Sequence, residues 1–176
     1  MLFTDSSIWT MVHGIGLGGG ALLGIAAALF YLYAACSAEG TVRRATNARA
    51  FAALTVVTAT LLLLAVLVGT YIVFPIYRTP PPPGATDLTA FPRALVLASP
   101  DTAWLHAFAM ESKEHMPWIA SMLVTAVAFV AVRYRSDLVD SAQLRNMAVS
   151  LLAISFTLVA LVSLLGVFVN KVAPLQ

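Results

Sequence analysis

Three histidines and their neighbours carry the chemistry that this sequence could perform. His13 stands at the head of the glycine-rich stretch HGIGLGGGALLG, and His106 and His115 enclose the charged stretch of SPDTAWLHAFAMESKEH. A neutral imidazole is a common metal and heme ligand, and its charge changes near physiological pH. Ionisable side chains are costly at membrane depth, so their presence beside apolar segments prompts a functional hypothesis. The three histidines therefore raise the hypothesis of a redox or metal site.

The glycines after His13 have two interpretations. On an ideal helix Gly16, Gly20 and Gly24 fall within about 60° of the His13 direction. Small residues of this kind line most close contacts between membrane helices. A histidine above them also fits a groove that admits the flat face of a porphyrin beside its axial ligand. The sequence leaves both interpretations open.

His106 and His115 point in different directions on one helix. Nine residues separate them, which corresponds to about 180° on an ideal helix. The His106 side continues through mostly small residues, typical of a packed face: Lys113, Pro117, Ala120, Ser121, Ala128 and Ala131. The His115 side is bulkier and suits lipid or a partner subunit: Glu111, Trp118, Met122, Ala126 and Phe129. At 1.5 Å per residue His13 and His106 also lie at similar depths, about 35 and 39 Å from the inner ends of their helices, against about 25 Å for His115. Both criteria favour His13 and His106 as a pair.

The charges around His115 allow two explanations. Glu111 is four residues before His115, so the carboxylate could hold the imidazole or share a metal with it. The run from Met116 to Val132 is already close to the minimum of about 17 residues for a span. The ESKEH segment would then lie among lipid headgroups, where charge is inexpensive.

Composition defines the elements that must position these residues. The chain has 176 residues, of which 60% are hydrophobic and 10% charged, and its mean hydropathy is +0.90. Soluble domains are nearer 45–50% apolar and about 25% charged. We therefore expect an all-α integral membrane protein, a single four-transmembrane-helix bundle with spans at about 8–36, 50–77, 101–133 and 145–170. Ser99 is expected to cap the third span, with Pro100 in its first turn.

The arginines predict the orientation of the bundle. Six lie in the two loops that follow the first and third spans: Arg43, Arg44, Arg49, Arg133, Arg135 and Arg145. The positive-inside rule places those loops in the cytoplasm and both termini on the extracytoplasmic side. Loop 78–99, with four consecutive prolines, is then extracytoplasmic and serves as a stiff spacer or as a docking ledge for another subunit.

Several function classes lack their sequence signals. The single cysteine, Cys36, cannot form an internal disulfide or a paired-cysteine zinc site. No run of basic residues alternates with aromatics, so nucleic acid is not an expected partner. Phosphate loops and nucleophile triads are absent, and the cytoplasmic loops are too short for an enzyme domain. A non-catalytic subunit is favoured over an enzyme.

At the level of architecture the protein resembles the small four-helix membrane subunits that hold b-type heme near one face. On this hypothesis it is an electron-transfer subunit of a larger redox complex in a bacterial-type inner or plasma membrane. His13 and His106 would be the axial ligands, with Gly16 and Gly20 beside the ring and Arg78 meeting the propionates. The expected partners are membrane lipids, other subunits of the complex and an extracytoplasmic cytochrome.

Two alternatives remain beside the heme hypothesis. His115 with Glu111 could serve a quinone, or these two residues could join His13 and His106 in an outward-facing metal site. The protein could instead be a cofactor-free accessory or scaffold subunit of a respiratory or photosynthetic membrane complex.

Overall fold

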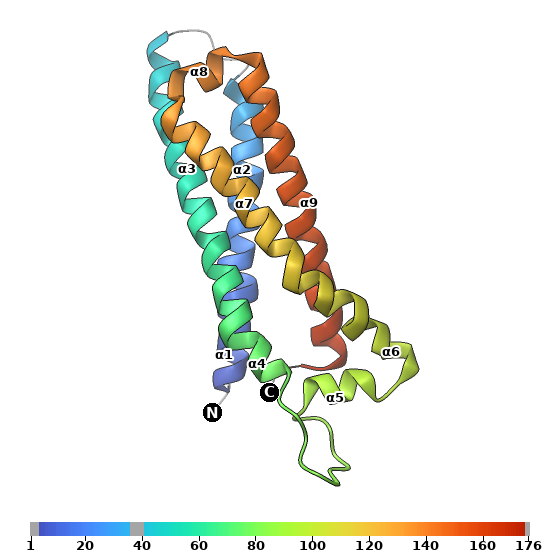
Figure 1. Ribbon diagram of the computed structural model, residues 1–176. Coiled ribbons are helices and arrows are strands. Elements are labelled where there is room, and N and C mark those ends of the chain that lie inside the picture. The colour runs from blue at the N-terminus through green and yellow to red at the C-terminus, as the bar shows by residue number, and fades with distance from the viewer. Residues whose placement is uncertain (1–3, 36–40, 175–176) are drawn as a thin grey trace.

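The protein is a bundle of four long helical spans joined by short connections. The computed structural model describes residues 4–35 and 41–174, and Figure 1 shows the spans side by side along most of their length. The first span consists of α1 (Asp5–Met11), η1 (Val12–Gly19) and α2 (Gly20–Ala35). The second consists of α3 (Thr41–Val68), η2 (Gly69–Val73) and α4 (Phe74–Tyr77).

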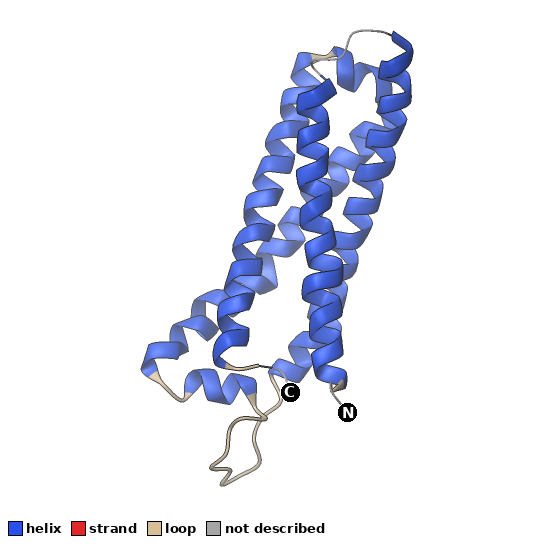
Figure 2. Ribbon diagram, turned by 180° about the vertical axis from the view of Figure 1, so that it is seen from behind, coloured by secondary structure: helices blue, strands red, loops and turns tan. Residues whose placement is uncertain are grey.

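The third and fourth spans complete the bundle. The third consists of α6 (Pro100–Trp104), η3 (Leu105–Met110) and α7 (Glu111–Arg133), and the fourth is the single helix α9 (Ala142–Val172). Two short helices lie in the connections: α5 (Pro92–Leu97) and α8 (Arg135–Asp140). In Figure 2 every regular element of the described residues is a helix.

The four spans predicted from the sequence are confirmed as helices. Residues 5–34, 48–77, 100–133 and 142–172 form helices that are long and apolar enough to cross a membrane. The marked ends of the chain lie at one end of the bundle, which we call the terminal end (Figure 1). An even number of spans requires this arrangement. The assignment of the terminal end to the extracytoplasmic side stays a prediction from the arginines.

The helix boundaries differ in part from those expected. The first helix begins at Asp5 and the fourth at Ala142, each three residues early, because Thr4 and Ser141 cap them by accepting the amide hydrogens of Ser7 and Leu144. The expected end of the first helix at residue 36 lies outside the described residues. Ser99 caps the third span through the amide of Asp101, at 3.3 Å, as predicted.

The two connecting helices were not predicted. Pro92 opens α5, and this helix buries Val96 completely against the bundle. Val96 belongs to a cluster at the terminal end in which the third and fourth spans meet Tyr77; its members are Tyr77, Val96, Leu105, Ala109, Met110, Leu165, Val169 and Ala173. Loop 78–99 therefore includes a segment that packs on the bundle.

The rest of the core contains many small residues and extends from the middle of the bundle to the end opposite the terminal end, where Leu138 of α8 is buried. Ala21, Ala28, Ala120 and Ala148 are buried there, and Tyr31 stacks on Phe51 with ring centroids 5.0 Å apart. Small residues let membrane helices approach closely. The van der Waals contacts made at close approach stabilise the bundle, because the hydrophobic effect does not drive helices together within lipid.

The predicted division of the third span into two faces is confirmed along α7. Its packed side buries Ala120, Ser121, Ala128 and Ala131, whereas Met122 and Phe129 on the other side are exposed. Small residues at helical spacing thus identified the side that faces the other spans.

Candidate functional site

Both histidines of the predicted pair lie in π-helical segments near the terminal end. His13 is in η1 and His106 is in η3, while η2 interrupts the second span at Gly69–Val73. A π segment inserts an extra residue into the helical turn, and such segments are frequent at functional sites. We describe the two histidines as separate clusters, the His13 cluster and the His106 cluster.

His13 reaches across to the second span. Its Nδ1 lies 2.9 Å from the carbonyl oxygen of Ala65, the residue one turn before Gly69. A Cβ at position 69 would lie 2.6 Å from His13 Cε1, so the imidazole occupies space that only glycine leaves open. The His13 cluster is thus built by a histidine from the first span and a glycine from the second.

The Ala65 bond fixes the tautomer of the imidazole. A carbonyl oxygen only accepts, so Nδ1 of His13 carries the hydrogen and donates it. In the neutral ring Nε2 then carries the free lone pair. Histidines that ligate metals generally donate their other ring N–H to a carbonyl or carboxylate in this way. His13 therefore has the hydrogen bonding of a ligand.

Lys113 adds a positive charge to the His13 cluster. Its side chain is half-buried, and it is the charged residue that acts electrostatically on His13. A Cβ at position 166 of α9 would lie 2.9 Å from Lys113 Nζ, so a second glycine makes room for a second ionisable side chain. Each of the four spans contributes a residue to this cluster: His13, Gly69, Lys113 and Gly166. The ammonium of Lys113 is therefore turned toward α9.

The glycine groove after His13 is divided by the π segment. Cβ atoms at Gly20 and Gly24 would contact Leu61 and Thr58, so these two glycines pack on α3, the helix that His13 also meets. A Cβ at Gly16 would meet nothing within 4 Å. The expected alignment of Gly16 with His13 assumed 100° per residue, and the π-helical turn of η1 changes that angle. Close packing is confirmed at Gly20 and Gly24, and Gly16 borders open space.

His106 contacts the end of the second span instead. The hydroxyl of Tyr77 lies 3.2 Å from His106 Nδ1, and the two ring centroids are 6.0 Å apart. Tyr77 is only 3% exposed and belongs to the apolar cluster of the terminal end. Four charged residues act on His106, two of each sign: Arg78, Arg93, Glu111 and Glu114. The His106 cluster is therefore a polar network at the edge of the bundle.

Arg93 connects α5 to this network. It acts electrostatically on both Tyr77 and His106, and its Nε is buried without a hydrogen-bond partner among the described residues. Arg78 is exposed at the end of α4, where its guanidinium lies 5.2 Å from the centre of the Phe74 ring. Either guanidinium could face a carboxylate, because the planar fork matches that group.

His115 is apart from both clusters. It is exposed, and its Nδ1 donates to the backbone carbonyl of Glu111 at 2.9 Å. The sequence predicted Glu111 as the partner of His115, but through its carboxylate. The backbone carbonyl of Glu111 accepts the hydrogen bond instead. Among the described residues, no three His, Cys, Asp or Glu side chains come together in a group that could hold a metal ion. The structure thus gives no support to the metal site of His13, His106, His115 and Glu111.

The two clusters meet the second span on different turns. Ala65 and Gly69 precede Tyr77 by twelve and eight residues, which is about 12 to 18 Å of helix. The charges that act on His13 and on His106 are also different sets. Figures 1 and 2 agree that α6 and its neighbours splay away from α1 at the terminal end. The structure brings His13 to Ala65 and Gly69, and His106 to Tyr77.

Sequence reasoning missed three partners of these side chains. Gly69 and Gly166 are isolated glycines within long apolar runs, and such a glycine signals close approach without saying what approaches. Tyr77 was interpreted as an interfacial aromatic, and its hydroxyl contact depends on a residue 29 positions away.

No protein-family model matches the chain, and neither the curated proteins nor the solved structures with which it was compared give a match.

Proposed function

We propose that this protein is an electron-transfer subunit of a larger redox complex, which holds a b-type heme in the half of the bundle near the terminal end. The observation that carries the proposal is the hydrogen bond from His13 Nδ1 to the Ala65 carbonyl, which leaves Nε2 available to ligate iron. Heme would supply one-electron transfer, and the apolar shell of the bundle would set its potential by excluding water.

The residues around His13 suit such a group. Lys113 places a positive charge near the imidazole, and Gly16, on the same π segment, is exposed with nothing within 4 Å of its Cβ position. Arg78 and Arg93 lie nearer His106 and are available for carboxylates at the terminal end. Together they would offset the negative charge that propionates bring into a membrane.

His106 is the second residue proposed to hold the heme, and its position would require a movement of its helix. Its Nδ1 is engaged by Tyr77 several turns from the His13 contact on the second span. For both imidazoles to ligate one iron, the η3 segment would have to shift toward η1. If His106 keeps its place, His13 alone would hold the heme.

The surroundings of the proposed subunit follow from its apolar surface. Large apolar side chains cover its outside, including Leu23, Phe30, Phe129 and Phe168, which suits a multi-pass protein among lipids or other subunits. The membrane would be a bacterial-type inner membrane, the redox partner an extracytoplasmic cytochrome, and a quinone could exchange electrons near His115 and Glu111.

A cofactor-free accessory subunit is the second candidate. The favouring observation is that each imidazole already has a structural partner: His13 bonds to Ala65, and His106 lies within hydrogen-bonding distance of Tyr77. Satisfied polar groups of this kind can hold membrane helices together without a ligand.

A reduced-minus-oxidised visible spectrum of the purified protein separates the candidates. The heme proposal requires sharp α and Soret bands that His13→Ala abolishes. His115→Ala is the matched control, because His115 is exposed and bonds only within its own helix. His106→Ala decides the number of ligands: loss of low-spin bands indicates two, and an unchanged spectrum indicates that His106 is not a ligand.

The opposite result is equally clear. A colourless preparation that contains no iron, obtained from a host that supplies heme to other membrane proteins, would contradict the heme proposal. If His13→Ala then lowers the unfolding temperature of the colourless protein and His115→Ala does not, the histidine acts as a packing element of an accessory subunit.

A further inference from the structure

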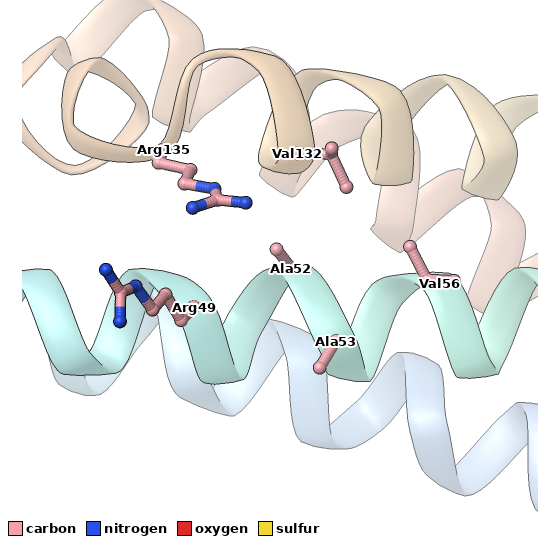
Figure 3. A pocket seen from close by; sticks show the side chains of 6 residues that line it. All are labelled: Arg49, Ala52, Ala53, Val56, Val132 and Arg135. Carbon is pink, nitrogen blue, oxygen red and sulfur yellow. The ribbon is translucent and has the colours of Figure 1, made fainter.

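A groove lies at the end of the bundle opposite the terminal end, between the second and third spans. It has a volume of about 360 Å³ and is lined by Arg49, Ala52, Ala53, Val56, Val132 and Arg135. Figure 3 shows the two arginines extending into one end of this groove from opposite walls, with the apolar residues beyond them. The groove is thus basic at one end and apolar along its length.

The order of these residues along their helices produces that division. Arg49 and Val56 are seven residues apart on α3, which is two turns on the same face. Val132 lies in the last turn of α7, which ends at Arg133, and Arg135 begins α8, so the arginine again lies toward the end of the bundle. Val56 and Val132 are 42% and 45% exposed, so the apolar part of the groove opens outward from the bundle.

The two guanidinium groups are exposed and carry like charges across a common gap. Among the residues whose side chains the structure describes, no hydrogen bond or ion pair joins either of them. Like charges that share a site repel, and an anion between them removes that repulsion. Guanidinium groups bind phosphate oxygens through paired N–H donors, so a phosphate is the anion that this geometry suits.

We propose that this groove binds an anionic phospholipid, with the phosphate between Arg49 and Arg135 and one acyl chain along Ala53, Val56 and Val132. The apolar part distinguishes a lipid from free phosphate, because it continues from the headgroup level along the outward-facing surface of the spans. The positive-inside prediction puts this end at the cytoplasmic leaflet, where anionic lipids gather and basic pockets between helices bind their headgroups. This proposal is independent of any cofactor in the other half of the bundle.

The test measures binding of phosphatidylglycerol to the purified full chain in neutral detergent, with a fluorescent acyl chain as reporter. Phosphatidylcholine with the same chains and inorganic phosphate are the two comparison ligands. We expect phosphatidylglycerol to bind about tenfold tighter than phosphatidylcholine, because the charge-assisted phosphate contact lacks a competing choline cation. Inorganic phosphate at millimolar concentration should not displace it.

Arg135→Gln and Arg133→Gln form a matched pair of variants. Both residues are exposed, and both substitutions remove one positive charge. Only Arg135 lines the groove, whereas the guanidinium of Arg133 lies 5.6 Å from the centre of the Tyr134 ring. We expect Arg135→Gln and Arg49→Gln each to weaken phosphatidylglycerol binding about three- to tenfold, and Arg133→Gln less than twofold. Equal losses for Arg133→Gln and Arg135→Gln would overturn the proposal in favour of general surface charge.

Ala53→Phe tests the apolar part of the groove. Ala53 is exposed at the edge of the groove, so the larger side chain should narrow the groove without disturbing the core, which circular dichroism checks. We expect weaker binding of phosphatidylglycerol. Unchanged binding, or full displacement by inorganic phosphate, would overturn the acyl-chain contact. Equal affinity for phosphatidylcholine would overturn the role of the arginines.

Discussion

Gly69 of the second span and His13 of the first fit together as a pair: the imidazole lies in the space left by the missing side chain of Gly69, and a Cβ there would be 2.6 Å from His13 Cε1. The same ring donates to Ala65, one turn away on the same helix. A polar side chain is thus accommodated between two membrane helices by one hydrogen bond and one missing methyl group.

This pair predicts the effect of Gly69→Ala. The methyl group would collide with the imidazole, and overpacking costs typically about 1–3 kcal/mol, partly offset by the better helix propensity of alanine. We expect a net destabilisation of about 1 kcal/mol or more, measured by unfolding in sodium dodecyl sulfate mixtures. Gly16→Ala is the control, since nothing lies within 4 Å of its Cβ position. A loss of stability as large in Gly16→Ala would contradict the assignment of the strain to His13.

Gly166→Ala tests the corresponding pair in the fourth span. Its Cβ would lie 2.9 Å from Lys113 Nζ and 3.6 Å from Cε, atoms at the far end of a flexible side chain. The lysine can move, so we expect a cost below that of Gly69→Ala. The loss should vanish in a Lys113→Ala background, and a double-mutant cycle measures this coupling. An additive result would show that the two residues do not interact.

Lys113→Met should stabilise the cofactor-free protein. The ammonium is half-buried between spans, and no hydrogen bond or ion pair joins it within the described residues. Methionine keeps a similar shape without the cost of burying charge, so we expect a gain of about 1 kcal/mol in the same unfolding assay. If heme is present, the variant should also have a lower midpoint potential, because a nearby positive charge favours the reduced iron. A large destabilisation would indicate an essential partner for the ammonium.

Tyr77→Phe removes the hydroxyl from the 3.2 Å contact with His106 Nδ1. An ordinary hydrogen bond contributes about 0.5–1.5 kcal/mol, and we expect a destabilisation of that order. The ¹⁵N shifts of the His106 ring should change, while those of His115 stay constant because its bond to Glu111 is remote from Tyr77. Unchanged shifts at His106 would contradict the contact. If His106 must leave Tyr77 to ligate heme, the variant should also bind heme more tightly.

Asp87 gives a prediction for pH in the proline-rich loop. Its carboxylate accepts the backbone amide of Thr89 at 2.9 Å and the Thr89 hydroxyl at 2.7 Å, and these bonds lower the pKa of the Asp87 carboxyl below its ordinary value. Because the pKa is lowered in the folded loop, the bonds stabilise the turn above the ordinary pKa and are lost as the pH falls through the lowered one. An NMR titration of the Thr89 amide should report this midpoint. Asp87→Asn, which cannot titrate, should show no such transition.

Much of the fold was predictable because it depends on local patterns. Apolar runs of sufficient length determined four spans, and Ser99 with Pro100 determined where the third begins. The spacing of Ala120, Ser121, Ala128 and Ala131 determined the packed face of α7, since that helix is regular and keeps its 100° period. The short helix α5 was not predictable, because six residues carry little periodicity and burial of Val96 holds it in place.

The candidate site depended on information that the sequence does not carry locally. The histidines were identified as the residues to examine, but their directions were calculated for ideal helices, and η1 and η3 are π-helical. Only the tertiary structure decided that His13 meets Ala65 and Gly69, and that His106 meets Tyr77. The physical reason is that a side chain's partner in a bundle is set by the rotation and tilt of two helices relative to each other, and these follow from the packing of all four.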